Sequence, residues 1–117
     1  MPFKASQRIR TTADFDNVYK NGRRAGDALF GIAFRANAAG VVRLGMSVGA
    51  RAIGNAVARN RLRRLIRESF RLRQRELPGI DIVITARPSA KTAAADELKK
   101  SLESHWQYLI RKCAASS

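Results

Sequence analysis

The hydrophobic pattern near the N-terminus predicts a short helix over about 13–21. Its apolar positions recur at the i, i+3, i+4 spacing of one helix face and are Phe15, Val18 and Tyr19. Thr12 is the expected N-cap, and Gly22 is the expected residue after the last turn. The segment 21–26 that follows is basic and contains two glycines, so we expect a loop there.

Two later segments alternate between apolar and other side chains, which is the period of a β-strand. They are 29–36 and 42–48, and the turn-forming segment 37–40 separates them. We expect these strands to pair as an antiparallel hairpin. One face of the hairpin is apolar, whereas the other carries small residues together with Arg35 and Arg43. This second face has room for a ligand or for the first helix, and for both if helix and sheet form the walls of a groove.

A second amphipathic helix is predicted over about 55–75, after a connection at 49–54. The apolar positions on one of its faces are Leu62, Leu65, Ile66 and Phe70. The segment 80–86 is an almost unbroken run of apolar and β-branched residues, which is typical of a central strand buried on both faces. Because a helix precedes it, we expect this strand to run parallel to its neighbour.

The last helix is predicted over about 93–112, after a turn at 87–89 and with Thr92 as its cap. Its apolar stripe consists of Leu98, Leu102, Trp106, Leu109 and Cys113, so we place Trp106 in the core. The predicted element order is α-β-β-α-β-α. The economical architecture is an α+β two-layer sandwich with helices on one face of a small mixed sheet.

Size and charge indicate a single domain with a polyanionic partner. The chain has 117 residues, so 1–117 forms one domain, and its formal net charge of +14 attracts nucleic acid or an anionic surface. Residues 1–10 are basic and lack the apolar region of a signal peptide, so we expect an extended basic arm and a cytoplasmic protein without a membrane anchor. Cys113 is the only cysteine, which fits a reducing compartment.

The second helix carries an unusual concentration of arginine. Eight arginines fall in the seventeen residues 59–75, and Glu68 is the only acid among them. Four of these arginines repeat at i, i+4 and form one stripe: Arg59, Arg63, Arg67 and Arg71. Like charges at this spacing repel each other, so a single-sign stripe indicates a polyanion that neutralises it. The planar guanidinium fork suits phosphate oxygens.

The sequence offers little for catalysis by the protein itself. His105 is the only histidine, and there is no acidic cluster of the kind that holds catalytic metal ions. The sequence therefore indicates a binding protein. RNA is the favoured partner, because the spread of the arginines suits neutralisation of a phosphate backbone more than readout of bases. A ribosomal or ribosome-assembly protein, a DNA-binding regulator and a self-sufficient nuclease remain as alternative hypotheses.

Four segments resemble the bacterial ribonuclease P protein subunit. The segment GNAVARNRLRRLIRE at 54–68 is similar to the signature helix of that family, with its Arg-Asn-Arg core. The strand before the signature is matched by RLGMSV at 43–48, and the strand after it by DIVITARP at 81–88. The first helix is matched by Asp14, Phe15, Val18, Tyr19 and Gly22. The resemblance covers nearly the whole chain in the right order.

The resemblance implies a ribosomal protein S5 domain 2-like fold, with a left-handed crossover that the general preference for right-handed βαβ units opposes. It implies an accessory subunit of an RNA-based endoribonuclease that removes the 5′ leader from precursor tRNA. The expected partners are the catalytic RNA and precursor tRNA, with one protein per RNA and no small-molecule substrate. The RNA carries the chemistry and holds most of the Mg²⁺, so no catalytic or metal-binding residue is expected in the protein.

Residue roles also follow from the resemblance. The expected contacts to the catalytic RNA are Arg51, Asn55, Arg59, Asn60, Arg61, Arg63, Arg64 and Arg67. The expected lining of the leader cleft is Phe15, Tyr19, Ala33 and Arg35. Three positions depart from the family pattern. Ala50 stands where a basic residue is common, Ala33 where an aromatic residue can occur, and Tyr19 where phenylalanine is frequent.

Overall fold

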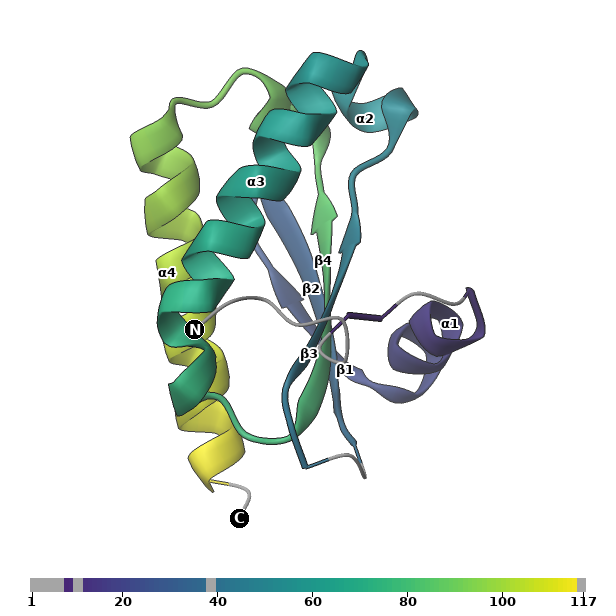
Figure 1. Cartoon of the computed structure of the whole chain (residues 1–117), viewed down its shortest axis with the longest axis vertical. Helices are drawn as coiled ribbons and strands as arrows, with labels where there is room; N and C mark the ends of the chain where they lie inside the picture. The colour runs from purple at the N-terminus through teal and green to yellow at the C-terminus, as the bar shows by residue number, and fades with distance from the viewer. Residues whose placement is uncertain (1–7, 10–11, 38–39, 116–117) are drawn as a thin grey trace.

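The computed structural model describes residues 8–9, 12–37 and 40–115 of the chain (Figure 1). The predicted basic arm falls mostly on residues outside these ranges. The helices and strands in chain order are α1 (Thr12–Asn21), β1 (Arg23–Gly26), β2 (Phe30–Ala36), β3 (Arg43–Ser47), α2 (Ala50–Ile53), α3 (Ala56–Arg73), β4 (Ile80–Ala86) and α4 (Ala95–Ala115). Short 3-10 turns at Gln74–Glu76 and Pro88–Lys91 flank β4.

The four strands form one mixed sheet in the order β1-β2-β4-β3. β4 runs parallel to β3 and antiparallel to β2, with Ile82 opposite both Leu44 and Phe34. The predicted hairpin between 29–36 and 42–48 is therefore wrong, because β4 lies between these two strands. The prediction that 80–86 is a central strand, buried on both faces, is confirmed, and the expected parallel pairing is found with β3. Placing the most apolar strand in the interior removes both of its faces from water.

The crossover from β3 to β4 is left-handed, as the family resemblance implied. In Figure 1 the chain rises through β3 at the near edge of the sheet, descends through α3 to its left, and rises again through β4 behind β3. This sense is rare for parallel βαβ units. Within the described part of the chain, no helix combines the length and the apolar character that crossing a membrane needs.

The main core lies between the sheet and the helices α3 and α4 (Figure 1). Trp106 is fully buried there and meets Phe70 edge to face, with ring centroids 5.8 Å apart. Its indole nitrogen Nε1 donates a hydrogen bond to Ser69 Oγ over 2.7 Å. The prediction that Trp106 belongs to the core is confirmed, and so is the apolar face of α3, of which Leu62 and Ile66 are also buried.

A smaller cluster lies on the opposite face of the sheet, beneath α1. Its buried members are Ile9, Val18, Ala33 and Val83, and Phe15 and Tyr19 pack at its border. The expectation that all helices share one face of the sheet is therefore wrong for α1. The helix instead covers part of the small-residue face, which was the other arrangement that the alternation allowed. Ile9 also ties residues 8–9 to the sheet, because its backbone nitrogen donates to the carbonyl oxygen of Leu44 over 3.0 Å.

Several predicted boundaries need correction. The expected loop at 21–26 contains β1, a four-residue edge strand whose mostly exposed side chains leave no hydrophobic period to detect. The connection at 49–54 contains the short helix α2. The last helix begins at Ala95, so Thr92 is not its cap. The first helix includes Thr12 as its first residue rather than as a preceding cap.

Candidate nucleic-acid interface

The arginine-rich helix α3 has a well-defined start. The side chain of Asn55 caps it, with Oδ1 accepting a hydrogen bond from the backbone nitrogen of Ala58 over 2.9 Å. Gly54, with φ of 96°, provides the left-handed turn between α2 and α3. Asn55 therefore has a structural role that the resemblance did not suggest, and its side-chain oxygen is already engaged. Arg51 lies exposed on α2, just before this corner.

The predicted arginine stripe lies along one side of α3. Arg63 donates to the carbonyl oxygen of Val48 (3.4 Å) and to Oδ1 of Asn60 (3.2 Å), which holds its guanidinium near the end of β3. Arg59 is half-buried, and its Nε has no hydrogen-bond partner among the described residues. Neither these two arginines nor Arg67 forms an ion pair with any carboxylate that the structure describes.

The fourth member of the stripe differs from the other three. Arg71 donates from Nε to Glu68 Oε2 over 3.2 Å and from Nη2 to Glu68 Oε1 over 2.5 Å. These hydrogen bonds lower the pKa of the Glu68 carboxyl below its usual value. The charge of Arg71 is thus balanced within the helix, whereas Arg59, Arg63 and Arg67 keep theirs for a partner.

The two remaining arginines of the predicted RNA surface lie on a different side of α3. Arg61 and Arg64 are exposed and line a groove of about 980 Å³ between α3 and α4. Asn60 lies between the two sides, since it contacts Arg63 and also lines this groove. The structure therefore separates the expected RNA contacts into two groups, which the linear sequence does not show.

The α1 side of the sheet holds the residues expected to line a leader cleft. Phe15 lies directly over Gly45, where an added Cβ would be 2.9 Å from the ring atom Cζ. Tyr19 forms a hydrogen bond between its hydroxyl and Thr85 Oγ1. Arg35 lies at the exposed margin and donates to Asn17 Oδ1 over 2.5 Å. Both aromatic rings are partly exposed at the border of α1 and can contact a ligand there.

Ala33 does not fit its expected role. It is 1% exposed and lies beneath α1 in the smaller cluster. A ligand beside α1 cannot reach it in this structure, so the expectation that it lines an open cleft is corrected. The physical reason is that Ala33 packs in one buried cluster with Val18 of α1 and Val83 of β4.

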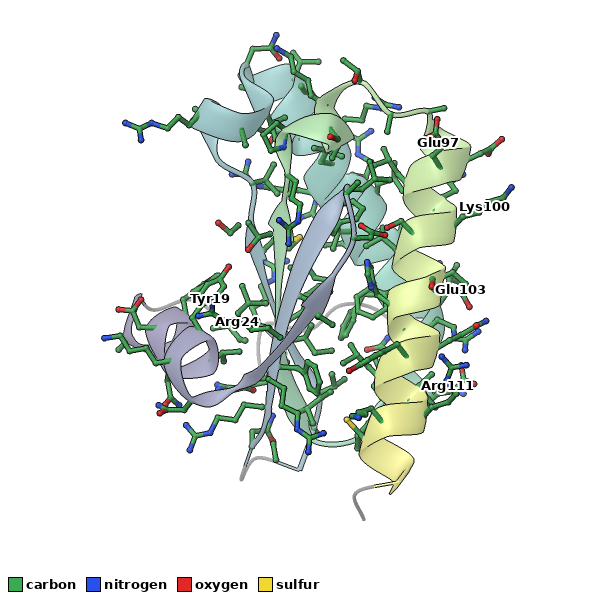
Figure 2. All side chains as sticks on the ribbon, turned by 180° about the vertical axis from the view of Figure 1, so that it is seen from behind. Tyr19, Arg24, Glu97, Lys100, Glu103 and Arg111 are labelled. Atoms are coloured by element: carbon green, nitrogen blue, oxygen red, sulfur yellow. The ribbon has the colours of Figure 1, made fainter. Side chains whose placement is uncertain are left out.

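Two arginines that the sequence did not single out lie on the same side of the sheet. Figure 2 shows Arg24 beside Tyr19, and its guanidinium carbon lies 5.8 Å from the ring centroid. The guanidinium of Arg87 lies over the sheet backbone at Gly26 and Gly31. A Cβ added at either glycine would be 3.2 Å from Nη2 of Arg87. Recognising 21–26 as an edge strand would have pointed to Arg24. Nothing in the spacing pointed to Arg87.

A partly buried ion pair between Arg43 and Asp81 lies at the other end of this face of the sheet. Asp81 accepts hydrogen bonds from Nε and Nη2 of Arg43, at 2.7 Å and 2.6 Å, and from Nδ2 of Asn37 at 2.8 Å. Burial alone would raise the pKa of the Asp81 carboxyl, but these hydrogen bonds outweigh it and leave the pKa lowered. Arg43 is thus committed to the fold and is not free to bind a ligand.

The structure also brings together Asp27, Ser101 and His105, although the sequence indicated no such arrangement. Ser101 Oγ donates to Asp27 Oδ2 over 2.6 Å, and His105 Nε2 lies 3.2 Å from the same oxygen. In a nucleophilic triad the histidine lies between serine and aspartate, whereas here the aspartate is central. Asp27 also accepts from the backbone nitrogens of Leu29 and Phe30, both over 2.9 Å. The group ties the β1–β2 turn to α4.

The described residues offer positive charge and partly exposed aromatic rings for binding a ligand. Among them, no group of three or more His, Cys, Asp or Glu side chains is placed to hold a metal ion. What the geometry offers is a face of unpaired arginines on α3 and a basic, partly aromatic face beside α1. Together with the small mixed α+β fold, this defines the class of RNA-binding proteins that use arginine to neutralise a phosphate backbone.

Comparison with known proteins agrees with this class and narrows it. The sequence family described as Ribonuclease P matches residues 3–110. The ribonuclease P protein component of Methylococcus capsulatus is 39% identical over 115 residues, which cover 98% of this chain and 90% of the relative. The component of Aliivibrio salmonicida is 38% identical over 109 residues, with 93% of each chain covered.

Solved structures show the same fold. The RNase P protein of Staphylococcus aureus superposes with a TM-score of 0.81 at 32% identity, covering 92% of this chain and 94% of that one. The RNase P protein of Thermotoga maritima gives 0.76 at 29% identity, covering 89% and 96%. The chain belongs to the ribonuclease P protein family. It is therefore a component of an endoribonuclease complex that processes tRNA, and its partner in that ribonucleoprotein is RNA.

Proposed function

We propose that this protein is the accessory subunit through which a catalytic RNA holds precursor tRNA during removal of the 5′ leader. The RNA carries the chemistry and holds most of the Mg²⁺, one protein serves each RNA, and the complex works in the cytoplasm. The observation that carries the proposal is the α3 face of Arg59, Arg63 and Arg67, three arginines without a carboxylate partner among the described residues. Such a face offsets the repulsion between two polyanions, the catalytic RNA and its substrate.

The leader is proposed to lie beside α1. Phe15 and Tyr19 offer partly exposed rings on which an unpaired base can stack. The basic groups nearby are Arg24, Arg35 and Arg87, which suit the sugar-phosphate backbone of the same strand. A substrate with a leader would thus bind better than the mature product, which has none.

The first experiment is cleavage of a 5′-extended precursor tRNA at low Mg²⁺, with the RNA subunit alone, the protein alone and both together. We expect cleavage only in the mixture. Cleavage by the protein alone would show that a catalytic site exists in it. If the protein gave no stimulation, a ribosomal or ribosome-assembly role would replace this proposal, and the RNA bound in cells would identify it.

The salt dependence of binding tests the arginine face. In the variant with Arg63→Ala and Arg67→Ala, the slope of log K against log salt for the RNA subunit should fall by about 1.5 to 2, or nearly one for each lost phosphate contact. Arg71→Ala is the matched control, since it removes an arginine from the same helix whose charge Glu68 already balances. An unchanged slope in the double variant, or an equal change in the control, would contradict the assignment.

A second variant tests the leader site. Phe15→Ala should weaken the binding of leader-bearing tRNA by about 1–3 kcal/mol if a base stacks on this ring. Mature tRNA should bind nearly as before, because it has no leader to place there. Equal losses for both ligands would point to damage in the packing of α1 instead.

A further inference from the structure

The groove between α3 and α4 exposes apolar side chains that the proposed RNA contacts do not use. The two helices lie side by side on one face of the sheet (Figure 1). Val57 is 80% exposed and Leu72 is 68% exposed, and both line this groove of about 980 Å³, with Leu65 between them along α3. Since Val57 and Leu72 are fifteen positions apart, the apolar strip is about 22 Å long.

The rim of this groove is positive. Arg61 and Arg64 on α3 and Lys99 and Lys100 on α4 line it, and none of the four forms an ion pair with a carboxylate in the described part of the chain. Figure 2 shows Lys100 on the outer side of α4.

The groove also contains two acids, but each already has a basic partner. Glu68 pairs with Arg71, and Glu103 pairs with Arg73, in both cases over 2.5 Å. The charge left for a partner to neutralise is therefore that of the basic rim. The occupant should be apolar along one line and negative on both sides of it.

The lining favours a protein over RNA. Among the described residues, no aromatic side chain lines the groove, whereas sites for unpaired bases commonly provide aromatic rings for stacking. Aliphatic side chains between two helices are instead the surface on which an amphipathic helix packs. A second copy of this chain is disfavoured, because each copy carries a net charge of +14 and would add basic groups to a basic rim.

We propose that the α3–α4 groove binds an acidic amphipathic helix of a protein partner. The strip from Val57 to Leu72 matches a helix of about four turns. Apolar residues at i, i+4, i+7, i+11 and i+14 of the partner, which span about 21 Å, would lie along the strip from Val57 through Leu65 to Leu72. Asp or Glu on both flanks of this stripe would face the basic rim. The resemblance counted Arg61 and Arg64 among the RNA contacts, whereas this proposal assigns them to the partner helix. Because this groove and the Arg59, Arg63 and Arg67 face are on different sides of α3, the partner helix and the RNA can bind at the same time.

The test uses the full-length protein and a labelled synthetic helix of about 18 residues, with a leucine stripe flanked by glutamates. A peptide of the same composition in scrambled order, which has the charge but no stripe, is the control ligand. Fluorescence anisotropy at about 0.15 M salt keeps long-range attraction to the +14 chain screened. We expect the ordered peptide to bind at least about tenfold more tightly than the scrambled one.

Variants then locate the site. Val57→Ser with Leu72→Ser should weaken binding by about tenfold without changing the charge, since both side chains are exposed and outside the core. Lys99→Glu with Lys100→Glu should weaken it by a similar factor and reduce its salt dependence. Arg111→Glu, an exposed position on the same helix that does not line the groove, should change binding by less than about twofold.

Three results would overturn the proposal. Equal binding of the two peptides would show that only charge is recognised, and insensitivity to the Val57 and Leu72 changes would place the peptide elsewhere. If single-stranded RNA displaced the peptide, and the Val57 and Leu72 changes also weakened binding of that RNA, the groove would be an RNA site. The Val57 and Leu72 variant is also assayed for cleavage of precursor tRNA together with the RNA subunit. This assay tests the proposed function, so a failure of the groove proposal can be told apart from a failure of that function.

Discussion

Replacing Asp81 by asparagine is expected to destabilise the protein by about 2 kcal/mol at neutral pH. The Asp81 side chain is 10% exposed and accepts two hydrogen bonds from Arg43 and one from Asn37. Asparagine has the same shape, but its amide nitrogen replaces one acceptor with a donor that faces another donor. A hydrogen bond to a charged group contributes about 1.5–3 kcal/mol, and Arg43 remains 26% exposed, so water compensates part of the loss.

The effect should depend on pH in a defined direction. The pKa of Asp81 is lower in the folded protein than the usual 3.8 of an unfolded chain, so folding favours its ionised form. Its contribution to the free energy of unfolding is then fully present well above pH 4 and declines as the pH falls from about 4 through the lowered pKa. The difference between wild type and Asp81→Asn should therefore shrink in strongly acidic buffer.

Urea unfolding followed by circular dichroism, between about pH 2.5 and 7, measures this difference. Asp16→Asn is the matched control, because it removes one negative charge from an exposed position and should cost less than about 0.5 kcal/mol. Arg43→Gln completes a double-mutant cycle, in which a coupling of at least about 1 kcal/mol is expected. A pH-independent loss, or a loss no larger than that of Asp16→Asn, would refute the reasoning.

Two further substitutions test the packing that positions the site. Gly22→Ala should lower the free energy of unfolding, measured by thermal unfolding, by about 3 kcal/mol, because the new Cβ would lie 2.4 Å from the carbonyl oxygen of Val18. Gly49→Ala is the control and should lower it far less, because an added Cβ there has no atom within 4 Å. Trp106→Phe should cost about 2 kcal/mol in urea unfolding, since it leaves a void and removes the donor to Ser69 Oγ. Adding Ser69→Ala to the Trp106→Phe variant should then lower the free energy of unfolding by no more than about 0.5 kcal/mol. A larger additional loss would show that Ser69 does not act through its hydrogen bond with Trp106.

Gly22 illustrates a correct residue with an incorrect reason. The sequence suggested a glycine that ends a helix in the left-handed region, yet Gly22 does not have a positive φ. Its need for glycine comes from two backbone carbonyl oxygens, since an added Cβ would be 2.4 Å from that of Val18 in α1 and 2.5 Å from that of Phe34 in β2. The second of these is a close approach of α1 to the sheet. Only the packing of α1 against the sheet creates that contact.

The strand pairing is a feature that the local hydrophobic pattern did not predict. The periods of β2 and β3 were visible in the sequence, and so was the apolar character of β4, because side-chain alternation is a local property. Which strand pairs with which is a long-range choice, and pairing β2 with β3 directly would have left β4 at an edge. The folded protein instead buries β4 between them, so the chain order does not match the order in the sheet.

The site divides in the same way. The spacing of Arg59, Arg63 and Arg67 along one side of a helix, and the recurrence of Phe15, Val18 and Tyr19, were determined by the sequence alone. So were the large positive charge and the scarcity of catalytic groups, since these are sums over the chain.

Tertiary structure decided which of these residues a partner can reach. Packing of α1 over the sheet buries Ala33. The pairing of Arg71 with Glu68 is by contrast a local i, i+3 contact within α3. Packing of α4 beside α3 separates Arg61 and Arg64 from the other arginines and forms the apolar groove. Helical spacing gives the direction in which a side chain leaves the helix axis. Only the neighbouring elements determine whether that direction leads to solvent, to a groove or to the core.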